Sequence, residues 1–210
     1  MIIAINFIAL ILAIVFHEVA HGYVALHFGD PTAKNQGRLT LNPIPHIDPI
    51  GSLLLPGLLI AAGSSFLIGW AKPVPVRMEY FKHPLKDMTW VALAGPLTNL
   101  SLATICSIII KLLKITPMIF SPGTYLVLDY FTFFLTSFIY INCLLAIFNL
   151  LPIPPLDGSK ILVYFLPPRA QETFFRLEPF GFVIIFALAY FGFFASVLPY
   201  LLNPLLQLFL

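Results

Sequence analysis

Two histidines and a glutamate interrupt an otherwise apolar stretch, IVFHEVAHGYVALHF, at residues 14–28. His17 and His21 are four residues apart, a spacing that places both imidazoles on the same face of an α-helix. Two imidazoles in that position can bind one zinc ion, and Glu18 between them can act as a base toward water. The spacing therefore predicts a zinc site that activates water for hydrolysis.

These three residues could instead be structural and pair with polar groups of neighbouring helices. Ionisable side chains within an apolar segment are costly unless they face the interior of a helix bundle, and they commonly mark functional sites. Three of them on one helix, at the spacing of metal ligands, favour the functional interpretation.

A catalytic zinc ion has three protein ligands and one open position for water, so a third ligand must come from elsewhere in the chain. We predict Asp157, which follows the sequence NLLPIPPL at the end of an apolar segment. Prolines at 152, 154 and 155 unwind the backbone there, and Gly158 leaves room for a close backbone approach. The other acidic residues lie in hydrophilic connectors, in turns or in the outer part of a span. The expected cofactor is one Zn²⁺ ion per chain.

The composition predicts that the elements holding these residues lie in a membrane. Of the 210 residues, 60% are hydrophobic and 10% are charged, and the mean hydropathy is +0.97. A soluble domain of this length has too little interior to bury so much apolar surface, so the lipid bilayer is the expected surrounding. The net charge of +2 gives no reason to expect a nucleic-acid partner. Cys106 and Cys143 both fall in apolar segments, so no disulfide framework is expected.

The expected fold is an all-α polytopic membrane protein of about four to six spanning or re-entrant helices. A short membrane-associated β element is expected between the first helix and the ALAGPLTNL segment. Residues 51–71 are apolar but repeatedly broken by Pro, Gly and Ser, which suits a re-entrant element better than a span. We expect a single domain, residues 1–210, with its core at about 2–165. The expected apolar helices cover about 2–28, 88–110, 124–151 and 180–210, with PPRAQETFFRLEP as a short interfacial helix.

The positions of the basic residues predict the topology. If residues 51–71 enter and leave on one side, nine of the eleven basic residues share that side, and Lys111 and Lys114 lie opposite. If these residues cross fully, the division is seven against four. The positive-inside rule favours the first arrangement. It predicts a multi-pass protein of the cell membrane, with the N-terminus outside and the active site toward the cytoplasmic side.

Three segments, FHEVAHGYVA, ALAGPLTNL and FNLLPIPPLDGSK, occur in this order and together resemble the site-2 protease family of intramembrane zinc metalloproteases. The resemblance extends from about residue 7 to about residue 165. It implies that His17, His21 and Asp157 are the zinc ligands and that Glu18 activates the water.

The resemblance also covers Asn99 in AGPLTN and Asn149 in FNLLP, and it implies that they hold substrate or stabilise the oxyanion. Hydrogen bonding between helices is the alternative for both asparagines. No PDZ-like insertion fits between the spans and no nucleotide-sensing domain is expected, so the chain is similar to a minimal form of the family.

Two further segments between the first helix and ALAGPLTNL allow two interpretations each. In NPIPHIDPIG, His46 and Asp48 could gate or inhibit the metal site, although caps of turns in a Pro-rich loop are favoured. The segment AKPVPV, residues 71–76, could be an edge strand that pairs with an extended substrate, or a plain linker.

The expected function is therefore zinc-dependent hydrolysis of a peptide bond in or near a transmembrane segment of a membrane-protein or peptide substrate. A zinc transporter would show several His and acidic sites along a path, often with a His-rich loop, and a non-catalytic scaffold of the same fold would not need Glu18. The sequence favours the protease over both. It leaves the identity of the substrate and the oligomeric state open.

Overall fold

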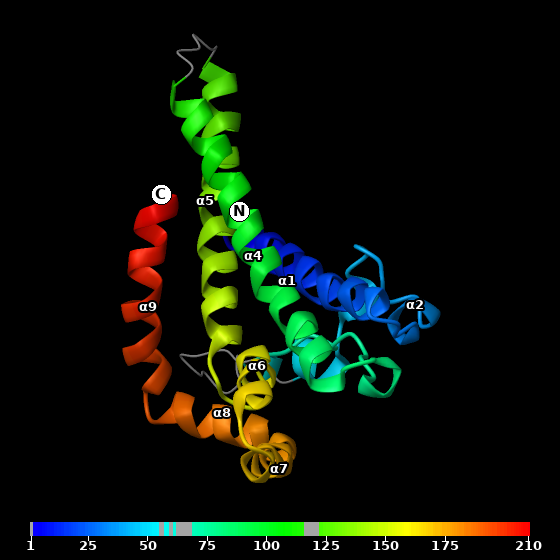
Figure 1. Cartoon of the computed structure of the whole chain (residues 1–210). Helices are drawn as coiled ribbons and strands as arrows, with labels where there is room; N and C mark the ends of the chain where they lie inside the picture. The colour runs from blue at the N-terminus through cyan, green and yellow to red at the C-terminus, as the bar shows by residue number, and fades with distance from the viewer. Residues whose placement is uncertain (1, 55–56, 59–60, 62–68, 116–121) are drawn as a thin grey trace.

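The computed structural model describes residues 2–54, 57–58, 61, 69–115 and 122–210. Within this part of the chain all regular structure is helical (Figure 1). The elements are α1 (Ile2–His27), α2 (Thr32–Asn35), the short turns η1 (Ile44–His46), η2 (Pro49–Leu54) and η3 (Met78–Tyr80), α4 (Pro84–Ile115), α5 (Pro122–Leu150), α6 (Asp157–Phe165), α7 (Pro168–Leu177), η4 (Glu178–Phe180), α8 (Gly181–Tyr190) and α9 (Phe193–Phe209).

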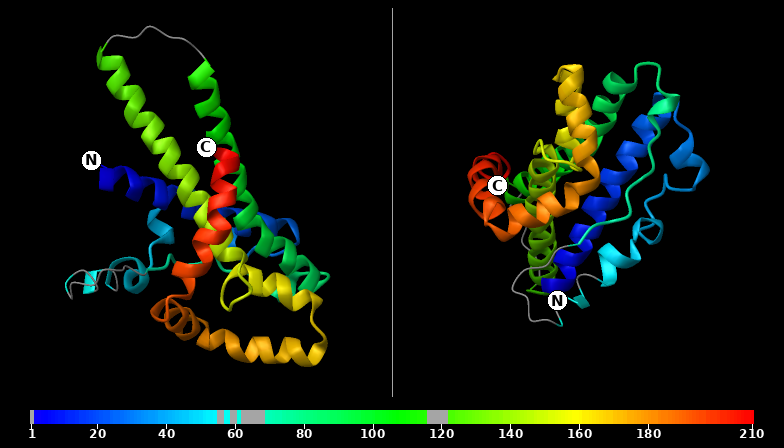
Figure 2. Two further views of the ribbon diagram at one scale, coloured as in Figure 1. Left: turned by 90° about the vertical axis from the view of Figure 1, so that its left-hand side faces the viewer. Right: turned by 90° about the horizontal axis from the view of Figure 1, so that it is seen from below.

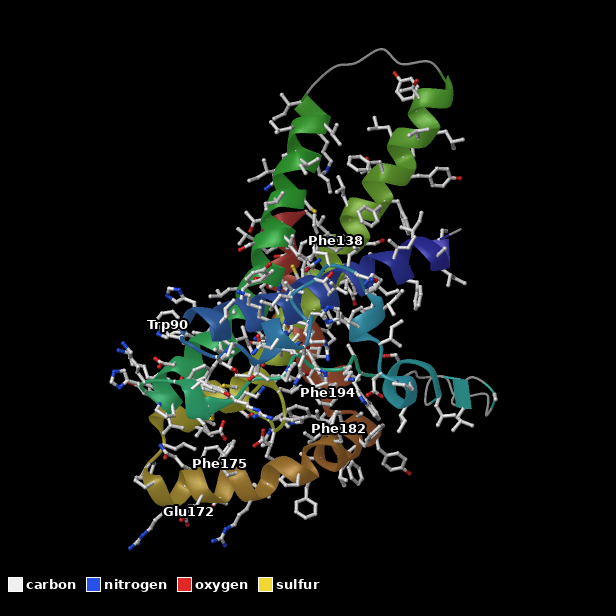
Figure 3. The ribbon with its side chains drawn as sticks, turned by 90° about the vertical axis from the view of Figure 1, so that its right-hand side faces the viewer. Trp90, Phe138, Glu172, Phe175, Phe182 and Phe194 are labelled. Carbon is white, nitrogen blue, oxygen red and sulfur yellow. The ribbon has the colours of Figure 1, made fainter. Side chains whose placement is uncertain are left out.

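Four helical stretches of the described chain are long and apolar enough to cross a membrane: α1, α4, residues 124–150 of α5, and the run from Pro168 to Tyr190 that comprises α7, η4 and α8. The first three match the predicted spans, and the protein is an integral membrane protein. The fourth run lies across the ends of α4 and α5 rather than beside them (Figure 2). Figure 3 shows Glu172 of α7 pointing away from the bundle, as expected for the polar face of an interfacial helix.

The central packing joins α4 to α1, α5 and α6. Small side chains permit close contact among α1, α4 and α5, because Ala9 and Ala13 of α1 and Ala103 of α4 are fully buried. Ile139 and Cys143 of α5 complete this contact and are also fully buried. The close approach brings the histidine-bearing turns of α1 against the first half of α4.

The predicted β element is not observed, because none of the described residues forms a strand. Residues 70–77 have no regular secondary structure. Pro73 and Pro75 have no N–H to donate, and the N–H of Val74 between them donates to the carboxylate of Glu18 instead of a neighbouring strand. Of the two interpretations of residues 71–76, the structure therefore shows a connector without strand structure, and this connector contacts a side chain of α1.

The two ends of the apolar segment 51–71 lie together. The N–H of Trp70 donates to the carbonyl of Gly51 at 3.2 Å, and the hydroxyl of Ser52 donates to the carbonyl of Trp70 at 2.9 Å. The residues at the two ends of this segment are therefore hydrogen-bonded neighbours. Most of the residues between these ends lie outside the described part of the chain.

Candidate metal centre

Three buried side chains predicted as metal ligands converge at the place where α1, α4 and α6 meet. His17 and His21 are one turn apart on α1, and their Nε2 atoms are 3.0 Å apart. Asp157 is the first residue of α6, and its Oδ2 atom lies 3.2 Å from each of the two Nε2 atoms. Among the described residues this is the one group of three His, Cys, Asp or Glu side chains placed to hold a metal ion.

The turn before α6 brings Asp157 to the histidines. Helix α5 ends at Leu150, and the chain then follows the prolines at 152, 154 and 155 before α6 begins. A Cβ at Gly158 would overlap the backbone carbonyl of Leu150 and lie 2.5 Å from that of Leu151. The close backbone approach predicted at Gly158 is therefore present, and only glycine fits there.

The hydrogen bonds of the two imidazoles define their tautomers. Nδ1 of His21 lies 2.6 Å from the carbonyl oxygen of Val91, which can only accept, so Nδ1 carries the proton. Nδ1 of His17 lies 2.6 Å from Oδ1 of Asn99, which also accepts. Both Nε2 atoms therefore present lone pairs toward Asp157.

This arrangement fits a metal ion. Two imidazole lone pairs and a carboxylate oxygen face one another, and Oδ2 of Asp157 is buried without a hydrogen bond from any described residue. Three acceptors that converge in a buried place repel one another unless a cation lies among them. Two nitrogen ligands and one oxygen ligand are a donor set that catalytic zinc takes.

Gly95 of α4 makes room for the two imidazoles. A Cβ at this position would overlap Cε1 of His17 and would lie 2.5 Å from Nε2 of His21 and 2.6 Å from Nε2 of His17. Sequence reasoning did not single out Gly95. Its position before Pro96 inside an apolar helix is the signal that could have done so, because Gly within a helix often marks a close approach.

Glu18 lies beside the cluster on α1, half-buried, and is held by the segment after Trp70. The N–H of Val74 donates to Oε2 of Glu18 at 2.7 Å. The buried guanidinium of Arg38 donates to the carbonyl of Lys72 at 2.7 Å and so fixes this segment from the other side. Burial lowers the pKa of Arg38, and the charge of Glu18 opposes that shift. The negative charge of Glu18 therefore stabilises the charged form of Arg38 across the segment.

The two asparagines of the family motifs lie in different surroundings. Asn99 is fully buried, and its Nδ2 donates to Oδ1 of Asn142 at 2.7 Å and to the carbonyl of Ala13 at 3.3 Å. Asn149 is half-buried in the last turn of α5, where its Nδ2 donates to the carbonyl of Leu145 at 3.0 Å. Asn99 therefore contacts the candidate metal site by its hydrogen bond to His17, whereas Asn149 bonds to its own helix.

His46 and Asp48 serve the loop in which they lie. Nε2 of His46 lies 3.0 Å from the carbonyl oxygen of Thr40. Oδ1 of Asp48 accepts the N–H groups of Ile50 and Gly51 at 3.0 and 2.7 Å, which caps η2. Asp48 thus has the turn-capping role that the sequence favoured over a gating pair, while the ring of His46 bonds across the same loop.

Two polar residues near the cluster were not predicted. Nζ of Lys160 lies 3.6 Å from Oδ1 of Asp157, one turn along α6. Asn142 is fully buried in α5 and bonds to Asn99. The (i, i+3) spacing in DGSK could have identified Lys160, and an asparagine within the otherwise apolar run 138–148 could have identified Asn142.

Apolar helices that bring a His-Glu-x-x-His pair and a distant aspartate together are the arrangement expected of a membrane-embedded metallopeptidase. Comparison with known proteins agrees with this class. Residues 113–192, which include Asp157, match the family model described as Peptidase family M50. The chain is 42% identical over 185 residues to the "Putative zinc metalloprotease YwhC" of Bacillus subtilis (strain 168), a match that covers 86% of this chain and 78% of that protein.

Two further relatives carry the same description. The chain is 35% identical over 178 residues to Rip2 of Mycobacterium tuberculosis (strain H37Rv), covering 85% of this chain and 63% of that protein. It is 33% identical over 159 residues to MJ0611 of Methanocaldococcus jannaschii, covering 75% of this chain and 69% of that protein. No solved structure matches the chain. The chain belongs to peptidase family M50, the site-2 protease family, whose members resembling it are described as zinc metalloproteases.

Proposed function

We propose that this protein is a zinc metalloendopeptidase that hydrolyses a peptide bond in or near a transmembrane segment of a membrane-protein substrate. The observation that carries the proposal is the convergence of His17, His21 and Asp157 beside Glu18, between helices that are apolar enough to span a bilayer. Membership of a peptidase family supports the hydrolytic reaction. The position of the cluster between apolar helices supports a substrate that is itself in the membrane.

His17, His21 and Asp157 would hold one zinc ion per chain. When bound there, zinc would make water more acidic and polarise the carbonyl of the scissile bond. Glu18 takes one proton from the attacking water, whose oxygen forms the new bond to the carbonyl carbon. As the C–N bond breaks, Glu18 delivers that proton to the leaving amine.

The contacts of Glu18 assign its two oxygens to different tasks. The Val74 N–H binds Oε2 and fixes the carboxylate, so we assign proton transfer to Oε1.

A substrate helix must unwind before it reacts, because its carbonyls are engaged in hydrogen bonds along the helix. We propose Asn149, in the last turn of α5, as a contact for the unwound substrate. Because the amide of Asn99 is fully buried and bonded within the chain, we assign it to positioning His17.

We propose that the protein lies in the cell membrane with its active site toward the cytoplasmic side. Helix α4 has 32 residues and is about 48 Å long at 1.5 Å per residue, so it exceeds the hydrocarbon core of a bilayer. Lys86 lies in its first turn, while Lys111 and Lys114 lie at its other end, away from α6 and α7 (Figure 1). The larger group of basic residues therefore shares the end of α4 that holds the metal cluster, as the positive-inside rule expects.

The test compares wild type with Glu18→Gln and with Glu79→Gln, the same substitution at an exposed position. Zinc content and cleavage of a generic single-span substrate are measured on each purified protein. We expect about one zinc ion per chain in all three, with cleavage lost by at least about 100-fold only in Glu18→Gln. Undiminished cleavage by Glu18→Gln would remove its proposed role. A folded wild type without zinc would overturn the proposal, and zinc movement across vesicles without cleavage would favour a transporter.

A further inference from the structure

We propose that Asn142 of α5 is a positioning residue for the metal centre. It acts through Asn99 and determines which ring nitrogen of His17 is offered to the metal. This inference rests on the proposed zinc site, and it assigns a role to a residue outside the three motifs of the family.

The amide of Asn142 has one possible orientation. Asn142 is fully buried, and one end of its amide lies 2.8 Å from the carbonyl oxygen of Phe138, four residues earlier on α5. A carbonyl oxygen only accepts, so the NH₂ group of Asn142 must face it. Oδ1 of Asn142 therefore points at the amide of Asn99. Figure 3 shows Phe138 in the central region of the bundle, where α1, α4 and α5 come together.

The orientation of Asn99 follows from that of Asn142. Oδ1 of Asn142 lies 2.7 Å from the Asn99 amide and can only accept, so it must receive the NH₂ group of Asn99. The carbonyl of Ala13 on α1 accepts from the same NH₂ group at 3.3 Å. Two acceptors on two different helices thus hold the Asn99 amide in one orientation, with its oxygen toward His17.

The orientation of Asn99 in turn selects the tautomer of His17. Oδ1 of Asn99 lies 2.6 Å from Nδ1 of His17 and requires a proton on that nitrogen. Nε2 is then unprotonated and faces Asp157 and His21. If the Asn99 amide were reversed, its NH₂ group would favour a lone pair on Nδ1 and a proton on Nε2. A metal ion cannot bind a protonated Nε2, because that nitrogen has no lone pair to offer. Asn142 disfavours this reversal, because the reversed amide would bring two oxygen acceptors together.

Zinc affinity is the direct measure of this role. The partner of a metal-bound histidine typically contributes 10- to 100-fold to metal affinity, and we expect about tenfold for Asn142, which is one step further out. The test measures the zinc dissociation constant of the purified full chain in detergent, by competition with a chromophoric chelator. The variants are Asn142→Leu, Asn99→Leu and the double variant. Thr136→Val is the matched control, because Thr136 also bonds to the carbonyl four residues earlier on α5.

The expected result is coupling between the two asparagines. Asn142→Leu should weaken zinc binding about tenfold when Asn99 is present and less than about twofold when Asn99 has been replaced. Thr136→Val should leave zinc affinity unchanged. A purely structural role for Asn142 predicts equal losses in both backgrounds, and that outcome would overturn the proposal, as would an unchanged affinity in Asn142→Leu.

A second variant covers the case in which Asn142→Leu does not fold. Asn142→Ala also removes the acceptor for Asn99 but adds no apolar volume, and it should show the same coupling. Failure of the zinc site itself is distinguishable from failure of this inference. A folded wild type that binds no zinc would overturn the proposed function, whereas zinc binding with additive losses would overturn the role of Asn142 alone.

Discussion

Replacement of Gly95 by alanine should weaken zinc binding by at least about 100-fold while leaving the helices intact. The new Cβ would lie 2.5 Å from Nε2 of His21 and 2.6 Å from Nε2 of His17. Atoms in contact are normally about 3.5 Å apart, so the methyl group would displace the imidazoles by about 1 Å. Neither ring can move away freely, because His21 is bonded to the carbonyl of Val91 and His17 to the amide of Asn99, both on the same helix as Gly95.

The expected loss is large because metal ligation tolerates little displacement. Ligand distances in metal sites vary by about 0.2 Å, and a reacting group misplaced by about 1 Å can cost about 100-fold in rate. We therefore expect zinc affinity and cleavage each to fall by at least about 100-fold. The intrinsic preference for helix changes in the opposite direction, because Ala is favoured over Gly by about 1 kcal/mol. Loss of helix therefore cannot explain the loss of zinc.

The assay combines chelator competition for zinc, cleavage of a single-span substrate and far-UV circular dichroism on the purified protein. Leu97→Ala is the control, because Leu97 is on the same helix and is 50% exposed. We expect it to bind zinc as wild type does. If Gly95→Ala bound zinc and cleaved substrate as wild type does, the close contact between α4 and the imidazoles would be refuted.

Two further substitutions test the elements around the cluster. Arg38→Met removes the hydrogen bond to the Lys72 carbonyl, worth about 1.5 kcal/mol for a charged donor, and should lower kcat about tenfold without changing zinc affinity. A parallel loss of zinc in the chelator assay would contradict a role confined to the segment that holds Glu18. Gly158→Ala places a Cβ against the backbone at the end of α5, which cannot yield, and should weaken zinc binding at least about tenfold by displacing α6. Wild-type affinity in this variant would show that the turn can relax.

Local spacing and hydropathy were enough to predict the long helices and the cluster ligands. The three spans begin and end close to the predicted residues, and α1 ends at His27, two residues before Gly29 with its φ of 104°. These features depend on the preferences of neighbouring residues and on the transfer of apolar side chains out of water, both of which are properties of the chain itself. The described residues do not show the predicted β element, and at Val74 the reason is long-range, since its N–H bonds to a glutamate 56 positions earlier.

The sequence by itself therefore determined a membrane protein with two histidines on one helical face, a glutamate between them and an aspartate after a proline-rich break. Only the tertiary structure decided how the histidines are held. His17 meets Asn99 across 82 residues of sequence, and Asn99 meets Asn142 across 43. A hydrogen bond between helices depends on their crossing and on the direction of each side chain, and no local pattern encodes either. The same holds for Gly95, because the space left by its lack of a side chain is filled by the two imidazoles only when α1 packs against α4.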